Sequence, residues 1–142
     1  MNNEIFQLFV YGSLRSGFHS EAYNYLTQYF TLVGPAKVKG KLYDKGDYPV
    51  ALATTENKFL TGELYRLKDP AQFSWAMEQI DDYEGLHVEA GETALYHREP
   101  VAAYIDGIEV IAWVYWYCGT TEGLKELEAG DVIEYLQQRN KR

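Results

Sequence analysis

The chain has 142 residues, of which 46% are hydrophobic and 24% charged, a composition that predicts one globular domain over residues 1–142 and excludes wholesale disorder. Its formal net charge of -8 disfavours contact with nucleic acid phosphates and anionic membranes, so we expect neither partner. The single cysteine, Cys118, and the lack of a basic-then-apolar segment in residues 1–30 favour a cytoplasmic location.

The first predicted element is a short strand that leads into a glycine-containing loop. Residues 5–10 are mostly β-branched or aromatic, which is typical of a strand buried on both faces. Glycine tolerates backbone angles closed to other residues, so the amides of Gly12, Ser13 and Leu14 can point the same way and form an anion site. Arg15 would strengthen that site. The alternative is an ordinary transition from strand to loop, which the pattern alone does not exclude.

The next part of the chain alternates between helical and extended patterns. Apolar residues recur every three or four positions across residues 19–29, which predicts a short amphipathic helix. Residues 31–43 then read as extended chain with a break at a Gly34-Pro35 turn. After a stretch of turn-forming residues, residues 50–52 and 59–67 predict two further strands.

A second helix is predicted to begin at Pro70, which suits the first helical turn, with Asp69 as the N-cap. Its apolar side chains fall on one face as far as Ile80, and Gly85 is a plausible end. Glu84 would then stand at the mouth of an element, where side chains face cavities. The alternative is that this acidic segment is a solvated helix end, as most acidic clusters are.

The last third of the chain predicts a hairpin and a terminal helix. Asp106-Gly107, between apolar runs at residues 94–104 and 108–117, is a strong two-residue hairpin signal. Residues 131–137 have helical spacing. Because the strands outnumber the helices and mostly follow one another, the predicted fold class is α+β, with a curled or closed mixed sheet.

Few residues support metal, nucleotide or thiol chemistry. The histidines, at positions 19, 87 and 97, lack metal-binding spacing, and one cysteine cannot build a thiolate zinc site, so we expect no metal. The sequence also lacks the glycine loops typical of nucleotide cofactors. The aromatic neighbours of Cys118 predict that its thiol is buried in a strand and inert.

Six short motifs occur in the order expected of a known family and cover nearly the whole chain. In chain order they are VYGSLRSG, LYDKGDYP, GELYRL, IDDYEG, YHREPV and AWVYWY. In this respect the chain resembles the gamma-glutamylcyclotransferase-like family. The resemblance implies a small mixed β-barrel with flanking short helices.

The resemblance also implies a reaction and its residues. In enzymes of the family the acid of the DxxEG motif, here Glu84, takes a proton from the α-amine of a γ-glutamyl substrate. The amine then attacks its own γ-carbonyl, which yields 5-oxoproline and a free amine without a cofactor. Tyr11, Gly12, Ser13 and Leu14 match the loop that binds the glutamyl moiety through backbone donors, in agreement with the anion site inferred from the residues.

Two functions remain open at this point. The first is a cyclotransferase, and the second is a non-catalytic domain that keeps the pocket for a small carboxylate. Glu84 favours the enzyme, because an acid beside a carboxylate-binding loop would weaken the binding of a carboxylate. Tyr115 is a further candidate for lining the substrate pocket, with core packing as its alternative role. The sequence indicates neither the amine released nor the oligomeric state.

Overall fold

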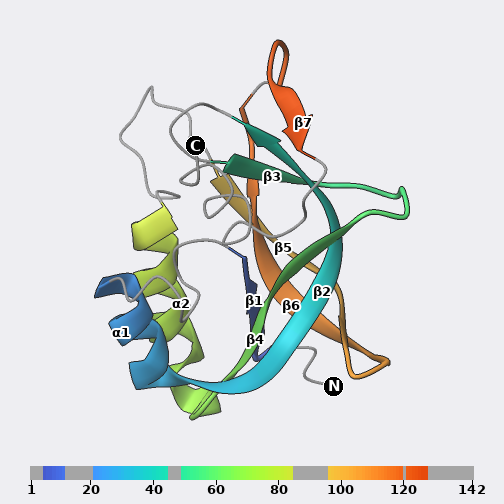
Figure 1. The fold of residues 1–142 in the computed structure, drawn as a ribbon. Helices are drawn as coiled ribbons and strands as arrows, with labels where there is room; N and C mark the ends of the chain where they lie inside the picture. The colour runs from blue at the N-terminus through green and yellow to red at the C-terminus, as the bar shows by residue number, and fades with distance from the viewer. Residues whose placement is uncertain (1–4, 12–20, 45–48, 85–95, 120, 128–142) are drawn as a thin grey trace.

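The computed structural model describes residues 5–11, 21–44, 49–84, 96–119 and 121–127, with the backbone alone at 21–23 and 82–84 (Figure 1). Ten elements follow one another along these ranges. They are β1 (Gln7–Val10), α1 (Glu21–Tyr29), β2 (Phe30–Asp44), β3 (Pro49–Ala53), β4 (Phe59–Leu67), η2 (Pro70–Gln72), α2 (Phe73–Glu84), β5 (Tyr96–Ile105), β6 (Ile108–Tyr117) and β7 (Lys125–Leu127). The predicted helix over residues 131–137 lies outside the described residues.

Five of the strands close into a barrel. Its strand order is β2, β4, β1, β6 and β5, and β5 pairs back onto β2 through Lys37↔Tyr104 and Val38↔Ala103. Only the β1–β6 pair among these contacts is parallel, with Leu8 opposite Trp113, so the barrel is mixed. β3 and β7 pair with the C-terminal part of β2, residues 40–44. The α+β class and the mixed barrel with two short helices are thus confirmed.

The apolar residues form two clusters, one inside the barrel and one between the barrel and the helices. Phe9 belongs to the interior cluster with Val114 and Trp116. Its neighbours Leu8 and Val10 belong to the second cluster, which also takes up the buried residues of α1 and α2. Alternation along β1 therefore places side chains in both clusters, which confirms a strand buried on both faces.

The entry into α2 follows from its sequence. Pro70 lies in η2, and the carboxylate of Asp69 accepts a hydrogen bond of 3.0 Å from the backbone N–H of Ala71, as an N-cap does. In α2 the buried side chains include Met77 and Ile80, which the helical spacing predicted. α1 and α2 lie together on one side of the barrel (Figure 1).

The hairpin prediction is confirmed, and two other predictions are wrong. Asp106 and Gly107 have φ angles of 50° and 77°, as a two-residue turn between β5 and β6 requires. No turn interrupts β2 at Gly34-Pro35, because β4 pairs with β2 on both sides of a register shift between Leu32 and Gly34. Cys118 is exposed rather than buried, because β6 ends at the preceding residue.

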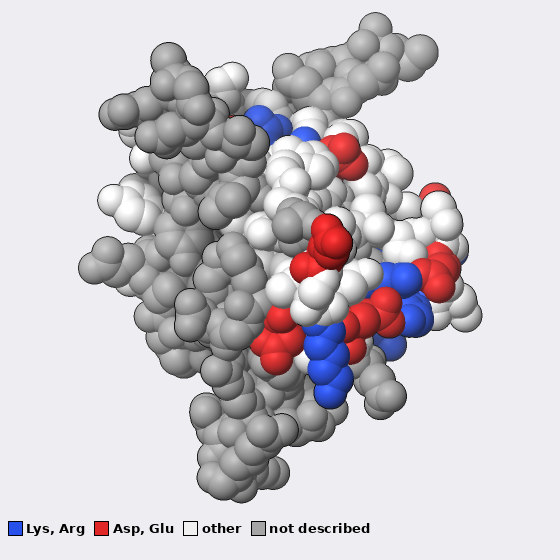
Figure 2. Space-filling model, turned by 90° about the horizontal axis from the view of Figure 1, so that it is seen from above, with Lys and Arg blue, Asp and Glu red and all other residues white. Residues whose placement is uncertain are grey.

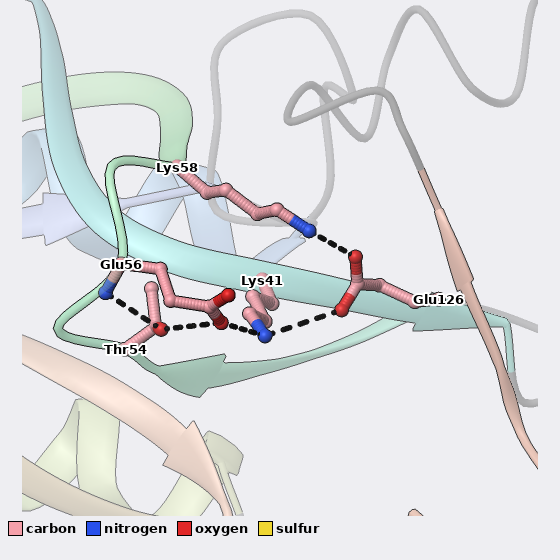
Figure 3. Close-up of polar contacts among 5 residues, drawn as sticks. All are labelled: Lys41, Thr54, Glu56, Lys58 and Glu126. Atoms are coloured by element: carbon pink, nitrogen blue, oxygen red, sulfur yellow. Dashed lines mark hydrogen bonds and ion pairs between the residues drawn. The ribbon is translucent and has the colours of Figure 1, made fainter.

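Ion pairs hold β7 and the turn before β4 against β2 (Figure 3). Lys41 of β2 pairs with Glu56 and lies 3.3 Å from Glu126 of β7, which also pairs with Lys58. Figure 2 shows acidic and basic side chains interspersed on the face seen from above.

Of the helices in the described ranges, none is long and apolar enough to cross a membrane.

Candidate active site

The elements that carry the predicted site residues end on the same side of the barrel. β1 and β6 run parallel, so their C-terminal ends lie on one side, and the C-terminal end of α2 lies there too (Figure 1). Tyr11 directly follows β1, Tyr115 is near the end of β6, and Glu84 is the last residue of α2. The fold therefore gathers three segments that are far apart in the sequence.

Tyr11 is fixed to β6 by its hydroxyl group. That group donates a hydrogen bond of 2.5 Å to the backbone carbonyl of Tyr115. The ring of Tyr11 also stacks on Trp116, with 6.4 Å between the centroids and 25° between the planes. The residue that opens the glycine loop is consequently anchored at two points on β6.

A charged cluster connects α2 to the same strand. Asp81 is 7% exposed and is the only buried polar or charged side chain in the described part of the chain. One of its carboxylate oxygens accepts bonds from the Tyr115 hydroxyl at 2.5 Å and from Arg98 Nε at 2.9 Å. The other accepts from Arg98 Nη2 at 3.0 Å. The Arg98 contact is thus bidentate, a geometry that restricts both partners.

Besides Asp81 on α2, the guanidinium of Arg98 contacts an aromatic ring on β6. Its central carbon lies 4.4 Å from the centroid of the Trp113 ring, within the range of a cation–π contact. The indole N–H of Trp113 in turn donates a bond of 3.0 Å to the carbonyl of Ile5, just before β1. Arg98 of β5 is therefore held between α2 and β6, and the cluster extends to the N-terminal end of β1.

The structure brings together two of the predicted site residues and leaves others undescribed. Tyr11 and Tyr115 are in direct contact, and Tyr115 is only 4% exposed. Its hydroxyl group is directed at Asp81, so the position of Tyr115 as a pocket residue stays a prediction. Gly12, Ser13 and Leu14 lie outside the described residues, as does the side chain of Glu84.

The pairing of Asp81 with Arg98 was not predicted from the sequence. Asp81 follows Met77 by four residues and Ile80 by one, so the helical period already placed it beside the buried face of α2. Arg98 stands in the YHREPV motif, and its position opposite Tyr115 in the β5–β6 hairpin gives the second signal. The two signals together would have identified an acid and a cation on facing elements.

The thiol of Cys118 lies in a separate polar group at the end of the hairpin. Its Sγ is 2.7 Å from Nδ1 of His97, whose Nε2 is 3.1 Å from Oε1 of Glu99. Partial burial of the Cys118 thiol raises its pKa, and the negative charge of Glu99 adds a smaller rise. Within the described ranges, no three histidine, cysteine, aspartate or glutamate residues gather in a way that could hold a metal ion.

Comparison with known families places most of the chain in one family. A family model described as "Gamma-glutamyl cyclotransferase, AIG2-like" matches residues 8–134, which include the loop after β1, all of α2 and the β5–β6 hairpin. The chain belongs to this family. The family-level resemblance seen in the six motifs is thereby confirmed.

Individual relatives span most of the chain. The protein MJ1514 of Methanocaldococcus jannaschii is 30% identical over 132 residues, covering 90% of this chain and 96% of its own length. The gamma-glutamylcyclotransferase family protein YtfP of Escherichia coli K12 is 28% identical over 129 residues, with the same coverage of 90% and 96%. A solution structure of YtfP matches with a TM-score of 0.58, covering 91% of this chain and 97% of that one.

A crystal structure of YkqA from Bacillus subtilis matches with a higher TM-score of 0.69 at 23% identity, which shows the fold alone. The match covers 96% of this chain and 43% of YkqA. The fold of this chain therefore matches less than half of YkqA.

Proposed function

We propose that the protein is a cofactor-independent cyclotransferase that converts a γ-glutamyl amine or γ-glutamyl amino acid to 5-oxoproline and the free amine. Glu84 is the general base and acid, and the loop from Tyr11 to Leu14 binds the glutamyl moiety. The observation that carries the proposal is the family match over residues 8–134, which contains both segments. The common anchor of β1 and α2 at Tyr115 supports it, because two groups that act on one substrate need a fixed separation.

The proposed reaction needs only one titrating side chain. The carboxylate of Glu84 takes a proton from the α-ammonium group, and the freed amine attacks the γ-carbonyl carbon. Backbone N–H groups of the loop stabilise the oxyanion of the tetrahedral intermediate. When the intermediate collapses, the bond to the leaving amine breaks and Glu84 returns a proton to that amine.

Cyclisation is favoured over hydrolysis because the attacking amine is tethered to the carbonyl that it attacks. Well-oriented intramolecular groups reach effective molarities of about 10⁵ to 10⁸ M, far above the concentration of water. The proposed reaction needs no covalent nucleophile, and the raised pKa of Cys118 makes its thiol unsuited to that role. The expected product is therefore 5-oxoproline.

The test is turnover of a panel of γ-glutamyl amines and γ-glutamyl amino acids in ¹⁸O-labelled water, with products analysed by mass spectrometry. Cyclisation yields 5-oxoproline without label from the solvent. Labelled glutamate as the main product would make the protein a hydrolase. Absence of turnover across the panel would favour the carboxylate-binding domain.

A pair of variants on one helix tests the assignment of Glu84. Glu84→Gln removes the base and keeps the size of the side chain, so we expect kcat to fall by about 10²- to 10⁴-fold. Glu78→Gln is the matched control, because Glu78 is an exposed glutamate on the same helix. A folded Glu84→Gln protein with the kcat of the control would contradict the assignment.

A further inference from the structure

The acid that precedes Glu84 by three residues is tied to two neighbouring strands. Asp81 accepts three hydrogen bonds from two side chains on neighbouring strands. It precedes Glu84 by almost one helical turn, or about 4.5 Å along the axis at 1.5 Å per residue. Whatever fixes Asp81 therefore also fixes the backbone of the last turn of α2.

A buried ion pair is a poor way to stabilise a fold. Desolvation of the two charges offsets most of their attraction, and apolar residues of similar volume often stabilise a protein as well or better. The Asp81–Arg98 pair does, however, specify geometry, because a bidentate contact sets the orientation of the carboxylate as well as its distance. The Asp81–Arg98 pair, whose side chains are 9% and 21% exposed, is thus better explained by placement than by stability.

Tyr115 connects this placement to the start of the glycine loop. Its hydroxyl donates to Asp81 on α2, and its backbone carbonyl accepts from Tyr11 at the end of β1. One residue of β6 therefore anchors both the helix that ends at Glu84 and the strand that leads into the loop. The two anchors use different atoms, so a substitution can remove one and leave the other.

We propose that Asp81, Arg98 and Tyr115 are positioning residues that set the end of α2, and with it Glu84, relative to the loop after Tyr11. This inference rests on the proposed function. It gives Tyr115 a role that differs from lining the pocket, because its hydroxyl acts through Asp81 rather than on substrate.

The decisive variant is Tyr115→Phe, which removes the bond to Asp81 and keeps the backbone carbonyl that anchors Tyr11. Displacement of a reacting group by 1 Å can cost about 10²-fold in rate, so we expect kcat to fall about 10- to 100-fold while KM stays within about twofold. The matched control is Tyr104→Phe. Tyr104 also hydrogen-bonds a carboxylate, that of Glu109, but at the opposite end of the same hairpin.

The kinetic pattern separates the three roles open to Tyr115. A rise in KM with unchanged kcat would mean that the hydroxyl binds substrate and would overturn the inference, as would kinetics equal to those of Tyr104→Phe. A lower unfolding temperature with unchanged kcat would mean a structural role only, and would also overturn it. In the positioning role, Asp81→Asn lowers kcat as well, and the double variant with Tyr115→Phe is no worse than the more impaired single variant.

Amide hydrogen exchange keeps the inference separate from the proposed function. Loss of the Tyr115 hydroxyl should speed exchange in residues 78–84 of α2, whereas Tyr104→Phe should not. If the wild-type protein turned over no substrate of the panel, the proposed function would fail and exchange would decide the positioning contact. Unchanged exchange in Tyr115→Phe would overturn that contact whether or not the protein is an enzyme.

Discussion

The backbone oxygen of Val10 and the ring of Phe9 leave no room for a side chain at Gly62 of β4, so substitution of this glycine should be costly. A Cβ atom at this position would lie 2.2 Å from the backbone oxygen of Val10 and 2.6 Å from Cζ of Phe9. Favourable carbon contacts begin at about 3.5 Å. Because the nearer obstacle is backbone, Gly62→Ala forces β1 away from β4 rather than rotating a side chain.

The expected loss of stability follows from these distances. Overpacking of a core costs about 1–3 kcal/mol, and a backbone obstacle places Gly62→Ala near about 3 kcal/mol. Alanine also lowers the conformational entropy of the unfolded chain relative to glycine, which offsets about 0.4–1 kcal/mol of this cost. The net destabilisation is then about 2 kcal/mol, which lowers Tm by about 6 °C for a domain of this size.

Thermal and urea unfolding followed by circular dichroism measure this loss. Gly40→Ala is the matched control, since its Cβ would approach Cδ1 and Cγ of Leu60 at 2.7 and 2.8 Å. Those atoms belong to a side chain rather than to the backbone, so we expect a smaller cost, roughly half that of Gly62→Ala. A wild-type Tm for Gly62→Ala, or a larger loss for Gly40→Ala, would refute the reasoning.

Two further predictions concern charged and reactive side chains. The Lys41 hydrogen bond lowers the pKa of Glu56 below its usual 4.5, so this pair stabilises the fold above that pH and the stabilisation is lost as the pH falls through the lowered pKa. The difference in urea midpoint between wild type and Lys41→Met should be small, because the Glu56 side chain is exposed to solvent. That difference should shrink from about pH 6 to about pH 3 and in high salt, and a constant difference would contradict this. The raised pKa of the Cys118 thiol predicts that iodoacetamide alkylates it several-fold more slowly than free cysteine near pH 8. Glu99→Gln should speed this alkylation, because the charge of Glu99 contributes to the raised pKa. Alkylation faster than that of free cysteine would contradict an inert thiol.

The sequence predicted those parts of the fold that depend on neighbouring residues. Alternation placed β4 at its observed bounds, Phe59–Leu67, and turn chemistry placed the Asp106-Gly107 hairpin. The error at Gly34 has a non-local cause, because only the pairing of β2 with β4 shows that a bulge replaces a turn. Barrel closure through Val38↔Ala103 is likewise invisible to local patterns and was expected only from the family resemblance.

The candidate site shows the same division within a single helix. The 3.6-residue period that placed Met77 and Ile80 in the core also puts Asp81 at the edge of the buried face, where an unpaired carboxylate would be costly. Composition gives no reason to bury that charge, because its partners Arg98 and Tyr115 come from a hairpin that begins after α2. The burial of the Asp81 carboxylate is explained only when β5 and β6 are placed against the helix. A buried acid one turn from the end of a helix, paired with side chains of two strands, is therefore a candidate for fixing the position of that helix end.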